Sequence, residues 1–164
     1  MMLRQLPSHR HHRTRCRQNR GFSLLELMIA LVVVGILVSI ALPSFNNAMR
    51  KSRRADAYTA LSAVQLAQER WRANRSTYSN SLGSTGLNLP SNSPNDHYEL
   101  AIDASDGTSY TVTASAKSTS SQSGDGNCVR LRLTMANGSI TYSSAPATGS
   151  TFDSAANNPC WNRS

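Results

Sequence analysis

Residues 22–42 read FSLLELMIALVVVGILVSIAL, an apolar stretch in which Glu26 is the one charged side chain. A helix that spans a bilayer needs about 20 apolar residues, whereas the apolar core of a cleavable signal peptide needs about 7–15. The length of the stretch therefore favours a membrane-spanning helix. It excludes a water-soluble fold built around one core for the chain as a whole.

Positive charge is concentrated in front of this stretch. The 164-residue chain carries 17 Lys+Arg against 9 Asp+Glu, a formal net charge of +8. Six of the arginines and none of the acids lie in residues 1–21, which leaves a net charge of only +2 for residues 22–164. The basic tail is expected to stay in the cytoplasm while the remainder is translocated. A second basic cluster at residues 50–54 argues for the opposite orientation, but it is smaller and comes later.

Glu26 separates two interpretations of the apolar stretch. The simpler one is an ordinary secretory signal, cleaved after Ala41 in the small-residue sequence Ser39-Ile40-Ala41. A carboxylate inside the stretch costs about 2.5–3.5 kcal/mol on insertion scales, and a discarded signal has no use for it. A retained acid with a function is therefore favoured, with a side chain that merely reaches the membrane interface as the alternative.

The junction between the basic tail and the apolar stretch is specific. Residues 20–27 read RGFSLLEL, with Gly21, Phe22 and Glu26 in order. This pattern resembles the class III leader junction of type IV prepilins. The resemblance implies cleavage after Gly21 by prepilin peptidase, N-methylation at Phe22, and assembly through pairing of Glu26 with the Phe22 amine of a neighbouring subunit. Separately, no enzyme signature occurs in the sequence, and His97 is the one histidine outside residues 1–21, so we expect no enzymatic activity, no cofactor and no metal.

Beyond the apolar stretch the pattern becomes amphipathic. One helical face carries, at spacings of three and four, the residues Ala57, Ala60, Val64, Ala67 and Trp71. This predicts one helix from Phe22 to about Arg72. Pro43 lies within it and is expected to kink it or melt it locally.

Four runs with period-two alternation follow a loop rich in Ser, Asn, Gly and Pro at residues 74–96. They begin near Tyr98, Tyr110, Val129 and Ile140, with the turn signals Asp106-Gly107 and Asn137-Gly138 between them. One apolar face of this antiparallel sheet needs a cover, which the helix provides. The sequence therefore predicts an α+β fold, a long N-terminal helical spine, transmembrane in its first half, packed on a four-stranded antiparallel sheet.

The resemblance divides the chain into a cleaved basic leader at 1–21, a transmembrane and filament-core helix at 22–49, and a periplasmic head at 50–164. Cys128 and Cys160 lie in the head, where an oxidising periplasm favours a disulfide over two unpaired buried thiols. The bond would close a loop of about 33 residues. This resembles the C-terminal disulfide loop of type IVa pilins, and the ending Cys160-Trp161 is similar to minor pilins of the PilE kind.

The resemblance implies a minor subunit of a type IV pilus, with roles in adhesion, twitching motility or DNA uptake. Its partners would be other pilin subunits, prepilin peptidase, and the inner membrane with the pilus assembly platform. We expect a single-pass inner-membrane precursor with its head in the periplasm, and later an extracellular pilus. The alternatives are a DNA-binding minor pilin for natural transformation and a type II secretion pseudopilin.

DNA is a further expected partner because arginines gather at two places. Arg130 and Arg132 project from one strand, opposite its apolar face, and Arg70, Arg72 and Arg75 cluster where the helix ends. Cations in such a patch bind phosphates with a steep salt dependence. The competing interpretation is two solvated faces on a head of low net charge.

Overall fold

The computed structural model describes residues 21–147 and 151–161, so the predicted leader lies outside the described residues except for Gly21. A single long helix, α1 (Leu24–Arg72), precedes the strands β1 (Tyr98–Ser105), β2 (Ser109–Ala116), β3 (Arg130–Ala136) and β4 (Ser139–Ala145). Two short 3-10 turns, η1 (Ser121–Gly124) and η2 (Gly126–Cys128), lie between β2 and β3. The chain divides between Ala41 and Leu42 into two compact units.

The first unit holds the apolar half of α1. This helix is long and apolar enough to cross a membrane, by length and composition. Its large side chains are exposed, with Leu24 at 77% and Val33 at 50%, so within the described residues nothing covers them. An apolar surface of this extent requires lipid or other helices around it. The helix continues without interruption through Pro43, so local melting does not occur there, and the kink stays a prediction.

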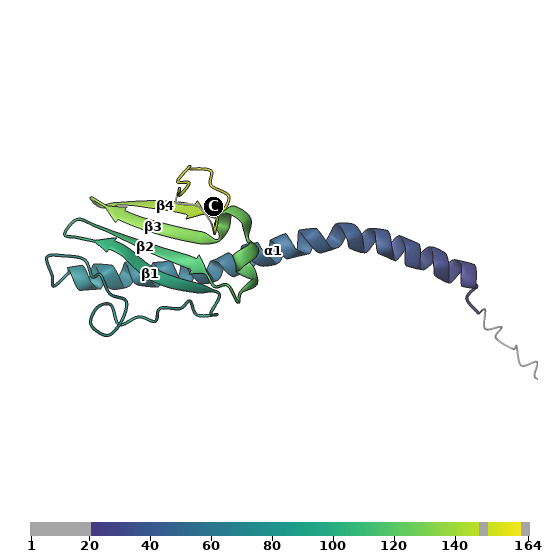
Figure 1. The fold of residues 1–164 in the computed structure, drawn as a ribbon, viewed down its shortest axis with the longest axis horizontal. Coiled ribbons are helices and arrows are strands. Elements are labelled where there is room, and N and C mark those ends of the chain that lie inside the picture. Colours follow the sequence, from purple (N-terminus) through teal and green to yellow (C-terminus); the bar gives the residue numbers. More distant parts are fainter. Residues whose placement is uncertain (1–20, 148–150, 162–164) are drawn as a thin grey trace, which may run out of the picture. The chain divides into compact units, whose positions relative to one another are not determined.

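The second unit is a head in which the C-terminal half of α1 covers one face of the sheet (Figure 1). The helix contributes Ala57, Ala60, Leu61 and Val64 to the core, as the predicted stripe requires. The stripe is wrong at its end, because Trp71 is only half-buried while Gln68 is fully buried. The Gln68 side chain donates to the carbonyl of Ser79 at 2.8 Å and accepts from its N–H at 2.9 Å. These two bonds satisfy its amide in the core.

The sheet is an antiparallel meander in the order β1-β2-β3-β4, as the alternating runs predicted. Its inner face presents two aromatic rings and a layer of aliphatic side chains: Tyr98, Leu100, Tyr110, Val112, Ala114, Leu131, Leu133 and Met135. The predicted hairpin turn between β3 and β4 is confirmed, because Asn137 (φ 49°) and Gly138 (φ 80°) both adopt left-handed backbone conformations. The predicted loop at 74–96 contains no helix or strand, apart from one bridge between Asn92 and Glu99.

Asp56 fastens this loop to the helix. Its buried carboxylate accepts hydrogen bonds from the Ser93 hydroxyl, from the backbone N–H and side-chain amide of Asn95 at 2.9 and 3.0 Å, and from the His97 N–H at 3.4 Å. Burial alone would raise the pKa of Asp56, but these hydrogen bonds to the charged form outweigh it and lower the pKa below its usual value. A negative charge on α1 therefore holds the chain just before β1 in place.

Asp56→Asn is expected to lower the free energy of unfolding at pH 7 by about 2 kcal/mol. The amide oxygen can accept only some of these hydrogen bonds, and the new amide NH₂ group would face N–H and O–H groups that are themselves donors. The folded pKa lies below the unfolded one, so this stabilisation is complete above about pH 4 and is lost as the pH falls through the lowered folded value. The difference between wild type and variant should therefore shrink in acid. Urea unfolding of the detergent-solubilised full chain, followed by tryptophan fluorescence at pH 7 and pH 3, measures it. Asp96→Asn, in an exposed pair with Lys117, is the control, and an equal loss in both variants would contradict this role.

Candidate functional site

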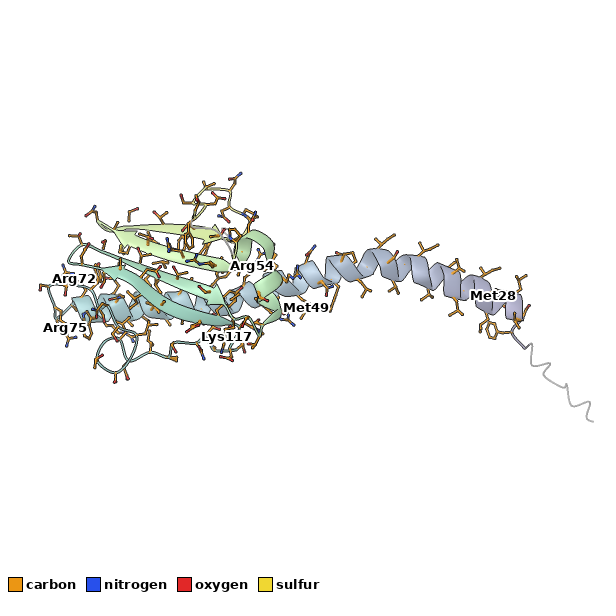
Figure 2. All side chains as sticks on the ribbon, viewed as in Figure 1. Met28, Met49, Arg54, Arg72, Arg75 and Lys117 are labelled. Carbon is orange, nitrogen blue, oxygen red and sulfur yellow. A yellow bond between two sulfur atoms is a disulfide. The ribbon has the colours of Figure 1, made fainter. Side chains whose placement is uncertain are left out.

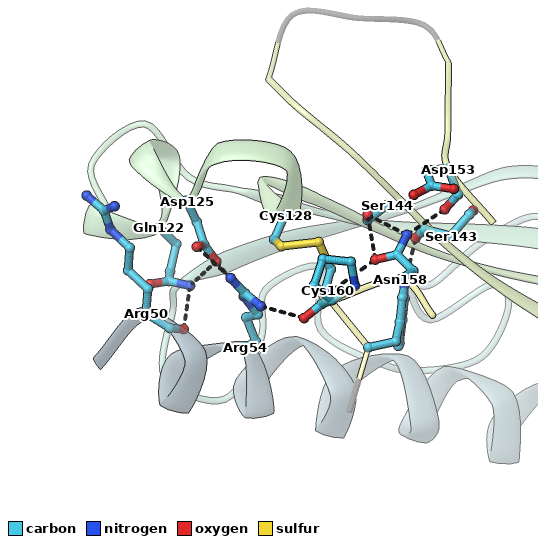
Figure 3. The surroundings of a disulfide bond; sticks show 12 residues. Arg50, Arg54, Gln122, Asp125, Cys128, Ser143, Ser144, Asp153, Asn158 and Cys160 are labelled. Carbon is cyan, nitrogen blue, oxygen red and sulfur yellow. Dashed lines mark hydrogen bonds and ion pairs between the residues drawn. A yellow bond between two sulfur atoms is a disulfide. The ribbon is translucent and has the colours of Figure 1, made fainter. Parts of the chain in front are cut away.

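The base of the head is held together by a disulfide and an ion pair (Figure 3). Cys128 at the end of η2 is bonded to Cys160, with 5.3 Å between the Cα atoms, which confirms the predicted pairing. The Arg54 guanidinium of α1 donates two hydrogen bonds to the Asp125 carboxylate, of 2.7 and 2.8 Å, and a third to the carbonyl of Pro159 at 3.1 Å. One helical side chain thus ties down both segments that the disulfide joins.

Two ionisable groups in this base, Arg54 and Tyr98, have raised pKa values. The hydrogen bond to Asp125 raises the pKa of Arg54, against the opposing effect of burial. Burial raises the pKa of Tyr98 to about 12, although the hydrogen bond from Gln122 opposes the rise. Gln122 is fully buried and also donates to the carbonyl of Arg50 at 3.1 Å. These contacts join α1 to the 3-10 turns at the base of the head.

Aromatic packing completes the anchoring of the C-terminal segment. Trp161 stacks on Tyr58 of α1 with 5.1 Å between ring centroids, and its indole N–H donates to the carbonyl of Ser143 at 3.0 Å. Tyr142 of β4 contacts the same indole, with centroids 4.7 Å apart. The hydroxyl of Tyr58 donates to the carbonyl of Cys160. The segment before Trp161 is therefore fixed to both the helix and the sheet.

At the opposite end of the head, arginines surround the last turn of α1. Figure 2 shows Arg72 and Arg75 together at this end, remote from Arg54 and Lys117. The Arg75 guanidinium lies 3.4 Å from the centroid of the Trp71 ring. Arg72 donates to the carbonyls of Arg75 at 2.6 Å and Gly107 at 2.8 Å, which fastens the β1–β2 turn to the helix. Arg72 is thus structural, whereas Arg75 is exposed and oriented by an aromatic face.

A shallow groove of about 570 Å³ runs beside these arginines. Its floor is apolar, formed by Ala63 and Ala67 of α1 and by Leu87 and Leu89 of the loop. Its end is formed by the side chains of Arg70, Trp71 and Arg75. Within the described part of the chain, no ion pair neutralises Arg70 or Arg75. The helix end therefore offers two available cations and an aromatic ring.

The second predicted arginine pair lies on the outer face of the sheet. Arg130 and Arg132 alternate with buried Leu131 and Leu133, so they project away from α1, as predicted. Both guanidinium groups lie over the ring of Phe152, at 4.8 and 3.5 Å from its centroid. Sequence patterns did not indicate this contact, because Phe152 lies in an irregular segment with no periodicity.

Arg132 is already engaged by acidic and hydroxyl groups. It lies 3.0 Å from the carboxylate of Asp103 and donates to the Thr113 hydroxyl at 3.0 Å, and that hydroxyl donates to Asp103 at 2.5 Å. The five predicted arginines therefore form two clusters on different faces, not one patch. Of the two, the cluster at the helix end has the more accessible charge.

The predicted assembly residues lie at the start of α1. Gly21 and Phe22 precede the helix, and Glu26 lies in its first turn, exposed among apolar side chains. The partial positive charge of a helix N-terminus favours a carboxylate there. No ion pair joins Glu26 to another residue of the described ranges.

No group of three or more His, Cys, Asp or Glu side chains among the described residues is arranged to bind a metal ion.

Comparison with known proteins identifies two family patterns. The family model described as "Type IV minor pilin ComP, DNA uptake sequence receptor" matches residues 43–132, more than half of the chain. The model of the prokaryotic N-terminal methylation motif matches residues 16–42, which include Gly21, Phe22 and Glu26. The two matches adjoin each other and cover the helix and most of the head.

Individual relatives agree with these patterns. Fimbrial protein EcpC of Eikenella corrodens is 26% identical over 124 residues, which are 75% of this chain and 80% of that protein. Type IV major pilin protein PilA of Myxococcus xanthus is 37% identical over 70 residues, 43% of this chain but only 32% of its own length. Type II secretion system core protein G of Klebsiella pneumoniae is 31% identical over 62 residues, 38% of this chain and 44% of that protein.

Proposed function

We propose that this chain, which belongs to the type IV minor pilin ComP family, binds duplex DNA with the end of its head helix while its apolar helix is held in a pilus. The observation that carries the proposal is the exposed pair Arg70 and Arg75 beside Trp71, free of acidic partners within the described residues. The name of the matching family, a DNA uptake sequence receptor, supports the same ligand.

The helix end suits phosphate contacts. Arg70 and Arg75 are both exposed, and stacking on Trp71 restricts Arg75, so less side-chain freedom is lost when it binds. The end of a helix also favours cationic side chains, which keeps them charged and in place. Contacts of this kind give affinity for duplex DNA, with specificity left to other groups.

The outer-face arginines are assigned a weaker role. Arg132 would have to leave Asp103 or share its charge with it, which reduces any gain from a phosphate. Phe152 holds both guanidinium groups against the sheet. We therefore expect this cluster to stabilise the outer face more than to bind DNA.

Replacing both exposed arginines, Arg70→Gln with Arg75→Gln, is expected to weaken duplex DNA binding by about tenfold or more near 100 mM salt. Two lost phosphate contacts should also reduce the slope of log K against log salt by about 2. Fluorescence anisotropy of a labelled duplex, titrated with the detergent-solubilised full chain at several salt concentrations, measures both quantities. Unchanged affinity in this variant, or a wild type that binds no duplex, rules the assignment out.

Two matched control variants distinguish an effect of the position of these arginines from an effect of the total charge of the head. Arg130→Gln with Arg132→Gln and Arg50→Gln with Lys51→Gln each remove the same charge elsewhere on the head. We expect both to change affinity less than threefold, which is close to the screened long-range effect of two charges. If the Arg130 and Arg132 variant loses as much DNA affinity as the Arg70 and Arg75 variant, DNA would instead be assigned to the outer face of the sheet.

The remaining predicted features form part of the same proposal. Cleavage after Gly21, methylation at Phe22 and a periplasmic head fit the methylation motif over residues 16–42 and the apolar helix that follows. Prepilin peptidase and the assembly platform are partners that such processing requires. The pseudopilin alternative is supported by a match over only 62 residues, against a family match over residues 43–132 for the minor pilin.

A further inference from the structure

A cluster of basic side chains lies on α1 just beyond its apolar half, at the base of the head. Arg50, Lys51 and Arg53 form this basic collar. No acidic residue occurs on α1 between Glu26 and Asp56, and Asp56 is buried beneath the loop that it anchors. Asp125, between the two neighbouring 3-10 turns, is paired with Arg54. The charge of the collar is therefore not offset by the elements around it.

Arg50 and Arg53 are half-buried, with the Arg50 guanidinium beside Gly124 of η1, and Lys51 is exposed. Arg53 donates to the Ser121 hydroxyl of η1. Figure 3 shows the guanidinium of Arg50 turned away from the marked contacts, and its backbone carbonyl is what accepts from Gln122. In the part of the chain that the structure describes, no ion pair engages Arg50 or Lys51. Two cations are thus available to a ligand outside the chain.

Position along the helix places the collar at the level of lipid headgroups. The apolar stretch ends at Leu42, and Arg50 lies eight residues later, about 12 Å further along the axis. The headgroup layer extends about 5–8 Å beyond the hydrocarbon on each side. Helical side chains point back toward the N-terminus, and the long stems of Arg and Lys extend the reach. Phe45, which is exposed, extends the apolar surface of the helix between the two levels.

From these positions and charges we propose that the basic collar binds anionic phospholipid headgroups in the membrane leaflet on the side of the head. The inference rests on the proposed membrane insertion of the apolar helix. Exposed hydroxyls of η1, on Ser121 and Ser123, add hydrogen-bonding groups beside the cations. These contacts exist only while the subunit lies in the bilayer, so they favour the membrane-held subunit over its transfer to a filament.

The test uses the full chain in nanodiscs made from phosphatidylcholine mixed with phosphatidylglycerol. Native mass spectrometry after release counts the lipids that each protomer retains. Wild type is expected to retain phosphatidylglycerol in preference to phosphatidylcholine. Each cation near an anionic surface contributes roughly fivefold, so Arg50→Gln with Lys51→Gln should reduce the preference about 20- to 30-fold. Arg70→Gln with Arg75→Gln removes the same charge at the far end of the head and should keep the preference.

The outcomes separate this inference from the function on which it rests. Wild-type protein that fails to enter the nanodisc overturns the membrane insertion, and this inference with it. Inserted wild-type protein that retains both lipids equally overturns the lipid contact alone. The contact is also overturned by equal loss in the two variants, which would indicate total charge. Unchanged lipid retention with impaired pilus assembly would assign the collar to a neighbouring protein instead.

Discussion

Glu26→Ala is expected to remove the subunit from pili while leaving it in the membrane. The side chain is exposed in the first turn of an apolar helix and has no ion-pair partner within the described residues. In a filament core it would be costly unless a cation met it, and the proposed cation is the Phe22 amine of a neighbour. Loss of one partner from a buried pair costs about 3–5 kcal/mol, so incorporation should fall at least tenfold. Membrane insertion should not suffer, because the variant lacks a charge that opposes it.

The measurement is the ratio of subunit in sheared pili to subunit in the membrane fraction. Glu69→Ala, which removes an exposed carboxylate from the head end of the same helix, is the matched control and should assemble normally. Mass spectrometry of the membrane fraction separates assembly from processing, since both variants should begin at a methylated Phe22. Normal incorporation of Glu26→Ala would refute the pairing, and a mature chain beginning at Leu42 would refute the pilin processing itself.

Cys128→Ala with Cys160→Ala is expected to destabilise the head by about 3–4 kcal/mol. The cross-link closes a loop with a sequence separation of 32 residues, and its loss frees the unfolded chain. The melting temperature should fall by roughly 10–15 °C for a unit of this size. Trp161, next to Cys160 and stacked on Tyr58, reports the local change by fluorescence.

Reduction supplies the control for this variant. Dithiothreitol should lower the melting temperature of wild type toward that of the double variant and should leave the variant unchanged. Arg54 and Tyr58 still contact the carbonyls of Pro159 and Cys160, so some order in the C-terminal segment should survive. A double variant with the same melting temperature as wild type would show that these contacts stabilise the head fully without the disulfide.

Regular periodicity made most of the fold predictable. The alternating runs gave four strands in the right order, and alternation is clearest in β3, where every second residue is buried. One helix to about Arg72 was predicted, but the local melting considered for Pro43 does not occur. The disulfide followed from two cysteines in one head. Trp71 was placed in the core by spacing alone, but the more polar Gln68 is buried because Ser79 satisfies its amide. Whether a polar side chain such as Gln68 is buried depends on a hydrogen-bond partner elsewhere in the chain, and a single sequence does not show which residues form such pairs.

The candidate site was predictable by composition but not by arrangement. Arginines were located correctly at the helix end and on β3, yet their partners Asp103 and Phe152 come from distant positions. The same limit applies to Asp56 and Arg54, whose roles depend on contacts with Asn95 and Asp125. Local patterns identify residue types that suit a ligand. Which of them remain available depends on contacts between segments far apart in sequence.

Each edge strand of the sheet is paired, along part of its length, with a short irregular backbone segment. The loop before β1 forms a bridge between Asn92 and Glu99, its Ser91 carbonyl accepts from the Leu100 N–H of β1, and the register of β1 against β2 shifts between Ile102 and Ala104. On the other side, Asp153 and Ser144 exchange two backbone bonds beside β4. Neighbouring heads packed at high density in a fibre are thus discouraged from joining by strand addition. Assembly would then be left to the exposed apolar side chains in the first half of α1.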